Sequence, residues 1–265
     1  MRPQIMAILN ATPDSFFEGS RVNVQMAIDK AGNYLNEGAD ILDIGGQSTR
    51  PGSVLVEANL EAERVLPVID AVCKNFPQSR ISVDTWYASV AQQALQMGAT
   101  MVNDISAGDD DLDMLPLIAK TGVQYIAMHK QGQPATMQNN PIYQNVVQDV
   151  LAYFKTKKMA FEQLGISNWI LDPGFGFGKT TEHNFSLLRN LRALREIGVP
   201  VLAGLSRKGM VWRTLNIEIS EALNGTTALH MAALMNGADY LRVHDVKEAV
   251  QCVTLYQYYS ANEFN

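Results

Sequence analysis

The sequence predicts an α/β fold, a TIM-type (β/α)8 barrel formed by a single domain over residues 1–265. Three observations predict it: short apolar runs ending in polar clusters recur eight times, helical stretches separate them, and 265 residues is near the usual size of one such barrel. Apolar strands that alternate with helices form a parallel sheet covered by helices. Eight repeats favour a closed barrel over an open, doubly wound sheet.

The expected strands are short runs of aliphatic or β-branched residues: Ile5–Leu9, Asp40–Asp43, Ile81–Val83, Met101–Asn103, Tyr125–Met128, Trp169–Leu171, Val201–Ala203 and Tyr240–Arg242. Between them, apolar spacings near three and four predict helices over Val24–Glu37, Glu57–Asn75, Ala88–Met97, Leu112–Lys120, Tyr143–Leu164, Thr181–Ile197, Ser220–Asn236 and Val246–Tyr259. Several end at a glycine, which supplies the left-handed residue that turns the chain back. The long polar loops at about 10–21 and 44–56 are expected to be lids over the barrel mouth.

Composition narrows the class of protein. A formal net charge of −6 argues against a general nucleic-acid or membrane surface, although local cations can still bind an anionic substrate. No apolar run is long enough to span a bilayer, and the start lacks a secretory leader pattern, so we expect a cytoplasmic enzyme. Cys73 and Cys252 have no metal-ligand spacing and are expected to be reduced thiols.

Acids and an amide stand at the ends of three predicted strands. Asp84 and Asp172 would enter the barrel mouth, where a carboxylate accepts paired hydrogen bonds from an amino-substituted heterocycle or stabilises a developing cation. Asn103 adds an amide with both donor and acceptor. The alternative to ligand binding is that these acids accept hydrogen bonds from nearby backbone amides. This alternative is the preferred interpretation for Asp104 but not for Asp84.

A glycine-rich stretch, 172–179, follows a predicted strand and precedes a helix. Its glycines let backbone approach a flat ligand, and its two phenylalanines, Phe175 and Phe177, offer ring contacts. A tight strand-to-helix turn with no ligand explains the pattern equally well.

Cations gather at the last strands. Lys208, Arg242 and His244 together favour phosphate or pyrophosphate recognition, whereas Arg207 alone favours ion pairing. No zinc motif appears, but Mg²⁺ needs few protein oxygens and can arrive with a phosphorylated substrate. For His129, the sequence favours the role of a polar loop residue over that of a catalytic base.

These motifs, in this order, resemble the dihydropteroate synthase family of pterin-binding enzymes, the folate-pathway enzymes that sulfonamides inhibit. The resemblance covers nearly the whole chain and rests on the strand-end segments 9–16, 43–52, 82–85, 103–105, 128–129, 172–179, 206–208 and 242–246. It implies a transferase that joins 6-hydroxymethyl-7,8-dihydropterin pyrophosphate to 4-aminobenzoate, releasing pyrophosphate. It also implies a homodimer through the last helices.

The resemblance implies a role for each matching residue. The pterin would be held by Asp84, Asn103, Met128, Asp172, Phe177 and Lys208, and the pyrophosphate by Thr49, Arg242 and His244. Asn10 would meet the Mg²⁺, and 4-aminobenzoate would meet Phe16, Arg50, Pro51 and Ser206. The expected path is SN1-like: Asp84 and Glu18 stabilise a pterin-methylene cation, and Lys208, Arg242 and His244 complete the catalytic set.

The chain departs from the family pattern in both lid loops. Gln47 replaces the usual Glu, and Phe17-Glu18-Gly19-Ser20 replaces Ser-Asp-Gly-Gly. These changes bear on sulfonamide binding and turnover more than on the pterin floor. Two alternatives stay open: a catalytically silent pterin-binding paralogue, and the methyltetrahydrofolate-binding domain of corrinoid methyltransferases, which has no need of the pyrophosphate-handling residues.

Overall fold

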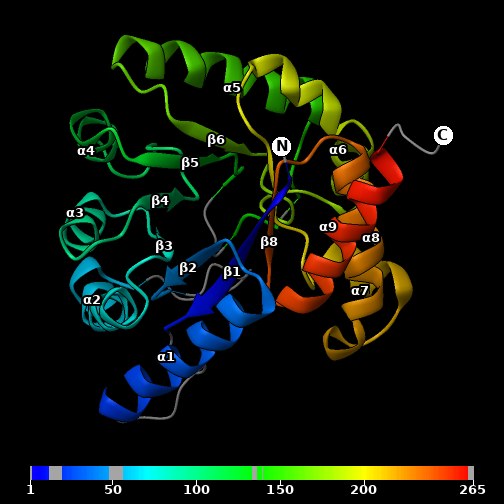
Figure 1. The fold of residues 1–265 in the computed structure, drawn as a ribbon. Coiled ribbons are helices and arrows are strands. Elements are labelled where there is room, and N and C mark those ends of the chain that lie inside the picture. Colours follow the sequence, from blue (N-terminus) through cyan, green and yellow to red (C-terminus); the bar gives the residue numbers. More distant parts are fainter. Residues whose placement is uncertain (1, 12–19, 48–55, 133–135, 139, 262–265) are drawn as a thin grey trace.

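The computed structural model describes residues 2–11, 20–47, 56–132, 136–138 and 140–261. The predictions made for Phe16, Phe17, Glu18, Thr49, Arg50 and Pro51 concern residues outside these ranges, as does most of the two predicted lids. Figure 1 shows strands gathered at the centre and helices around them.

The described residues form one sheet of eight parallel strands in the order β6-β5-β4-β3-β2-β1-β8-β7. Their bounds are β1 Gln4–Asn10, β2 Ile41–Gly45, β3 Arg80–Asp84, β4 Met101–Asp104, β5 Gln124–Met128, β6 Trp169–Asp172, β7 Leu202–Ala203 and β8 Tyr240–Val243. The ring closes where Leu171 pairs in parallel with Val201 and its N–H donates to the Pro200 carbonyl at 2.9 Å. The predicted barrel and all its strands are confirmed.

The helices lie outside the strands (Figure 1): α1 Ser20–Glu37, α2 Ala58–Asn75, α3 Ala88–Gln96, α4 Met114–Thr121, α5 Val146–Gln163, α6 Thr181–Arg189, α7 Gly209–Leu215, α8 Leu223–Met235 and α9 Val246–Ser260. The helix predicted over Thr181–Ile197 is instead α6 followed by a 3-10 helix, η2 (Leu191–Ile197). The break lies at Asn190, whose side-chain amide donates to the Ser186 carbonyl at 2.8 Å.

The predicted helices differ from the structure at two further places, and each involves a short helix. The helix predicted over Ser220–Asn236 is a 3-10 turn, η3 (Ile219–Glu221), followed by α8. Sequence periodicity missed α7, because seven residues span barely two helical turns. No helix in the described part of the chain is long and apolar enough to cross a membrane.

Strand alternation divides the barrel interior into an apolar floor and a polar mouth. Met6, Ile41, Met101, Ile126, Ile170, Leu202 and Tyr240 form a buried cluster from seven of the strands. Two residues further along β4, β6 and β8, on the same face of each strand, stand Asn103, Asp172 and Arg242. The outward-facing strand residues pack instead against the helices in the main core. The two-residue alternation of side chains along each strand therefore places apolar residues in the floor of the barrel and polar residues in its mouth.

Candidate active site

Strand register brings the predicted residues together. Asn10 lies opposite Gly45, Gly45 opposite Asp84, and Asp84 opposite Asn103 along neighbouring parallel strands. On the other side of the barrel, Met128 of β5 lies opposite Asp172 of β6. Because residues paired in a parallel sheet point to the same face, these side chains all face the mouth.

A cavity of about 980 Å³ occupies this mouth. That volume is typical of a site for small organic ligands. Its lining includes the predicted residues Asn10, Asp84, Phe177, Ser206, Lys208, Arg242 and His244. Its lining also includes residues that sequence reasoning did not assign, among them Gln47, Met137, Gln138, Lys179, Trp212 and Arg213. Nothing in the sequence pattern around 137–138 indicated that the loop after β5 reaches the cavity.

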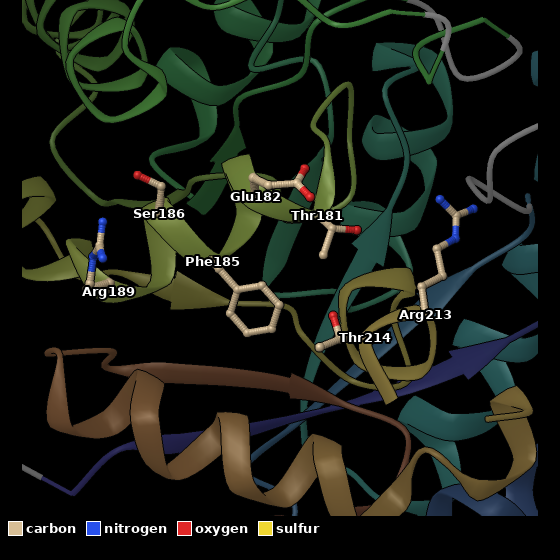
Figure 2. A pocket seen from close by; sticks show the side chains of 7 residues that line it. All are labelled: Thr181, Glu182, Phe185, Ser186, Arg189, Arg213 and Thr214. Carbon is tan, nitrogen blue, oxygen red and sulfur yellow. The ribbon is translucent and has the colours of Figure 1, made fainter. Parts of the chain in front are cut away.

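A second hollow of about 800 Å³ lies on the outer side, between α6 and α7. Figure 2 shows its lining, with Phe185 between Arg189 and Arg213 in this view. No residue predicted for the site lines it, although Thr181, Glu182 and Arg213 border both hollows. The predicted site residues that line a hollow therefore all line the cavity in the barrel mouth.

Arg242 bridges two carboxylates at the centre of the mouth. Its Nε donates to Asp43 Oδ2 at 2.6 Å, and its Nη2 donates to Asp84 Oδ2 at 2.5 Å. Asp43 Oδ2 also accepts from Asn103 Nδ2 at 3.1 Å. Asp43 is fully buried and holds both an arginine and an amide, yet sequence reasoning did not single it out. The available signal was an acid in an otherwise apolar strand, with the spacing of the inward face.

Electrostatics favour retention of the arginine charge. Burial would lower the pKa of Arg242, but Asp43 and Asp84 outweigh that effect and raise it. Burial raises the pKa of Asp84, to which Asp43 also contributes, and Arg242 opposes the rise. The mouth thus holds a permanent cation beside the Asp84 carboxyl group, whose charged form it favours.

Lys208 and Asp172 face one another across Gly204. A methyl group added at Gly204 would lie 3.6 Å from Lys208 Nζ and 3.9 Å from Asp172 Oδ2. Lys208 Nζ also donates to the Phe175 carbonyl and lies 4.8 Å from the centre of the Phe177 ring. Burial lowers the pKa of Lys208 to about 8. These groups border a space suited to a flat, polar-edged ring.

An apolar wall completes that space. Met128 and Phe177 belong to a buried cluster with Trp86, Ile105 and Met137, which confirms that the two predicted residues lie together. Of the two phenylalanines in the glycine-rich stretch, Phe175 is fully buried in the main core. Both phenylalanines nevertheless line the cavity, so the expectation of ring contacts with a ligand stays a prediction for each.

Ser206 and His244 form a neighbouring polar pair. Ser206 Oγ lies 3.0 Å from His244 Nδ1 and accepts from the His244 backbone N–H at 3.2 Å. Arg207 turns away and donates to both oxygens of Asp245 at 2.9 Å. The ion-pair interpretation of Arg207 is confirmed, and the predicted phosphate-binding residues Lys208, Arg242 and His244 all line the cavity.

Other singled-out residues are structural. Asp104 accepts hydrogen bonds from Ser106, Gly108 and the Tyr125 hydroxyl, so its predicted capping role is confirmed. His129 Nδ1 lies 3.0 Å from Lys179 Nζ, and burial lowers the pKa of His129 to about 3. A lysine ammonium only donates, so a neutral His129 ring accepts at Nδ1, in agreement with a structural role.

Gln47 is the residue of the second loop that departs from the family pattern. Its side chain holds the chain in place where that loop ends. Its Oε1 accepts from the Val56 N–H at 2.5 Å, and the Tyr87 hydroxyl donates to the Val56 carbonyl at 3.0 Å. A glutamate could make the same contact with Val56. The amide therefore keeps the tether and removes one negative charge beside the cavity.

Comparison with known proteins agrees with this geometry. A family model described as pterin binding enzyme matches residues 6–244. Dihydropteroate synthase of Escherichia coli is 42% identical over 254 residues, which are 95% of this chain and 89% of that protein. The chain belongs to the dihydropteroate synthase family of pterin-binding enzymes.

Solved structures of this family superpose closely. Dihydropteroate synthase of Yersinia pestis, in complex with a sulfonamide drug, has a TM-score of 0.92 and 40% identity, covering 97% of this chain and 94% of that one. The enzyme of Xanthomonas albilineans with 4-aminobenzoic acid has a TM-score of 0.92 and 39% identity, covering 99% and 94%. The family resemblance inferred from the motifs is confirmed; the role of each residue stays a prediction.

Proposed function

We propose that this protein catalyses dihydropteroate synthesis: 6-hydroxymethyl-7,8-dihydropterin pyrophosphate and 4-aminobenzoate yield 7,8-dihydropteroate and pyrophosphate. The observation that carries the proposal is a cavity lined by Asp84, Lys208 and Arg242, with the Asp172 carboxylate next to Gly204 of the lining. Family membership over nearly the whole chain supports it.

The floor of the cavity suits a pterin ring, which carries N–H donors and carbonyl or ring-nitrogen acceptors along its edge. Asp172 and Asp84 supply acceptors, and Lys208 supplies a donor. Asn103 already donates through Nδ2 to Asp43, so its Oδ1 is the atom oriented to accept from the ring. Met128 and Phe177 would contact the ring faces.

The pyrophosphate would lie nearer the rim, on Arg242 and His244, with Thr49 from the second loop. Arg242 uses Nε and one Nη2 N–H for its two carboxylates, which leaves further guanidinium donors for the leaving group. Its contacts to Asp43 and Asp84 hold those donors in place before substrate arrives. Preorganised donors of this kind stabilise charge that develops on a leaving oxygen.

The reaction would break the methylene–oxygen bond first. The electron pair leaves with pyrophosphate, and the resulting cation is delocalised into the pterin ring, beside the carboxylates of Asp84 and Glu18. The 4-aminobenzoate nitrogen then forms the new carbon–nitrogen bond and loses a proton. Ser206, Phe16, Arg50 and Pro51 would position the arylamine, which needs placement more than activation.

Magnesium fits the donor set present. Asn10 lines the cavity and offers an amide oxygen, a ligand type that Mg²⁺ accepts. Among the described residues no cluster of three or more His, Cys, Asp or Glu could hold a metal ion, so the ion would depend on pyrophosphate oxygens as well. When bound, Mg²⁺ would neutralise charge on the departing pyrophosphate.

The same proposal includes a homodimer in the cytoplasm. Three large apolar side chains are exposed on the last helices: Met235 at the end of α8, and Leu255 and Tyr258 on α9. Burial of such side chains against a second copy would remove apolar surface from water. Sedimentation of the purified protein as a dimer would support this part, and a monomer at micromolar concentration would contradict it.

The deciding experiment is turnover by purified protein given dihydropterin pyrophosphate and Mg²⁺, with and without 4-aminobenzoate. Dihydropteroate and pyrophosphate in equal amounts, dependent on both substrates, are the expected result. Pterin binding without product would instead support a silent paralogue. A Gln47→Glu variant then shows whether the altered second loop is the cause.

A further inference from the structure

Lys179 has no role in the proposed chemistry, yet its ammonium lies at the junction of two loops. The side chain is 2% exposed, and the described residues place four acceptors around Nζ. These are His129 Nδ1, the Gly174 carbonyl and the Phe177 carbonyl, each at 3.0 Å, and the His129 carbonyl at 3.3 Å. An ammonium has three hydrogens, so protein acceptors can occupy all of them.

We use the term loop seam for the contact between residues 129–132, 136–138 and 140–143, after β5, and residues 173–179, after β6. The seam has no spare room: a methyl group added at Gly174 would lie 1.9 Å from the His129 carbonyl oxygen, and one at Gly178 would lie 2.2 Å from that of Gln131. The Tyr143 hydroxyl donates to the Gly178 carbonyl at 2.9 Å. Backbone therefore packs directly on backbone, with carbonyl oxygens turned toward Lys179.

The loop after β6, which Lys179 contacts, positions several of the groups proposed to bind the pterin. The Gly174 N–H donates to Asp172 Oδ1 at 2.7 Å, which orients that carboxylate. Phe177 supplies the ring near Lys208, and the Phe175 carbonyl accepts from Lys208 Nζ. Any shift of this loop would move all three groups together.

We infer that Lys179 is a positioning residue for pterin binding: its ammonium locks the two sides of the loop seam together and so sets Asp172, Phe177 and Lys208. The inference rests on the proposed function, because it assigns the ligand that these groups hold. Two other roles are distinguishable from it: direct contact with substrate, and a contribution to overall stability alone.

The test compares Lys179→Met with Lys74→Met, an exposed lysine on α2 whose partner is Asp70. Calorimetry would measure binding of 6-hydroxymethyl-7,8-dihydropterin and, separately, of inorganic pyrophosphate. We expect Lys179→Met to weaken pterin binding by about tenfold or more, equivalent to about 1.4 kcal/mol. Pyrophosphate binding should change by less than about twofold, because Arg242 and His244 lie outside the seam. Lys74→Met should match the wild type for both ligands.

Hydrogen exchange supplies an independent readout. In Lys179→Met, faster exchange confined to residues 129–132, 136–138, 140–143 and 173–179 would support the inference, because the contact that holds the two loops together has been removed. Equal weakening of both ligands, with faster exchange throughout, would show a general loss of stability and overturn it. Unchanged pterin binding would also overturn it. Selective loss of pterin binding without faster exchange in the seam would overturn it too, because it would indicate direct contact between Lys179 and the pterin.

A second variant decides the matter if Lys179→Met does not fold. Tyr143→Phe removes one hydroxyl from the seam and leaves the ammonium in place. A smaller but selective loss of pterin affinity is expected, and an affinity equal to the wild type would overturn the inference. Wild-type protein that fails to bind pterin at all would instead contradict the proposed function.

Discussion

Arg242 shows how one residue of the mouth serves structure and chemistry together. It is joined to Asp43, 199 positions away in the chain, and to Asp84, 158 positions away. Because Asp43 retains the arginine when Asp84 is changed, the two acids can be separated by substitution. Asp43 orients Arg242, whereas Asp84 also lines the cavity, where it would face the cation of the proposed reaction.

Asp84→Asn should therefore lower turnover far more than stability. The amide keeps the shape of the side chain but removes the charge beside the cation, and preorganised electrostatic groups of this kind contribute about 10²–10³-fold to kcat. Steady-state kinetics and thermal unfolding should be measured on the same preparation. Parallel loss of folding and activity would contradict the catalytic assignment.

Asp43→Ala should cost both stability and activity. It strips a fully buried carboxylate from Arg242 and Asn103, and removal of one partner of a buried ion pair typically costs about 3–5 kcal/mol. The matched control is Asp70→Ala, which breaks an exposed pair with Lys74 and should cost about 0.5 kcal/mol. Urea unfolding of both variants checks the difference, and equal costs would refute it.

At the scale of elements, the register of the strands and the contact between neighbouring loops place the site. Six of the mouth residues follow from register alone, as pairs such as Asp84 with Asn103 and Met128 with Asp172 illustrate. The predicted strand ends were enough to anticipate these neighbours. The loop after β5 was not anticipated, because Met137 and Gln138 carry no motif and reach the cavity only through the loop seam.

Gly174→Ala tests the packing of the seam. Its φ of +69° is a left-handed conformation, and a methyl group there would meet the His129 carbonyl oxygen at 1.9 Å. The matched control is Gly122→Ala, with φ of +65° and no atom within 4 Å of the added methyl group. Backbone strain alone should cost the control about 1 kcal/mol, whereas Gly174→Ala should also abolish pterin binding. Calorimetric binding and thermal unfolding distinguish the two, and equal behaviour of the variants would refute a role for close packing.

At the scale of the whole molecule, the protein is acidic, yet the basic side chains proposed to bind substrate lie in the barrel mouth. The chain carries a net charge of −6, yet Lys208 and Arg242 lie in the mouth where anionic groups of the proposed substrate would bind. Buried acids accompany them, so stability is expected to depend on pH. Glu61, fully buried on α2, is the clearest case.

Glu61→Gln should remove a destabilising effect at alkaline pH. Burial raises the pKa of Glu61 from 4.5 to about 8, and among the described residues neither carboxyl oxygen has a hydrogen-bond partner. The folded state thus holds a proton that the unfolded state has lost, so stability contributed by this group is complete below pH 4.5 and declines as pH rises to about 8. The slope for one proton is about 1.4 kcal/mol per pH unit.

Urea unfolding of wild type and Glu61→Gln across pH 5 to 9 measures this effect. We expect the two curves to converge at the acidic end and the variant to be the more stable above pH 8. A constant offset between the curves at every pH would show that Glu61 does not titrate in this window.

The sequence by itself determined the barrel, the strand ends and the identity of most mouth residues, because apolar periodicity and strand-end polarity are local properties of the chain. Only the tertiary structure decided the partners: Asp43 with Arg242 and Asn103, and Lys179 with the carbonyls of two loops. It also decided that Phe177 packs with Met128 in one cluster while Phe175 belongs to the main core. The physical reason is that these contacts depend on strand register, barrel closure and loop packing, which join residues far apart in sequence.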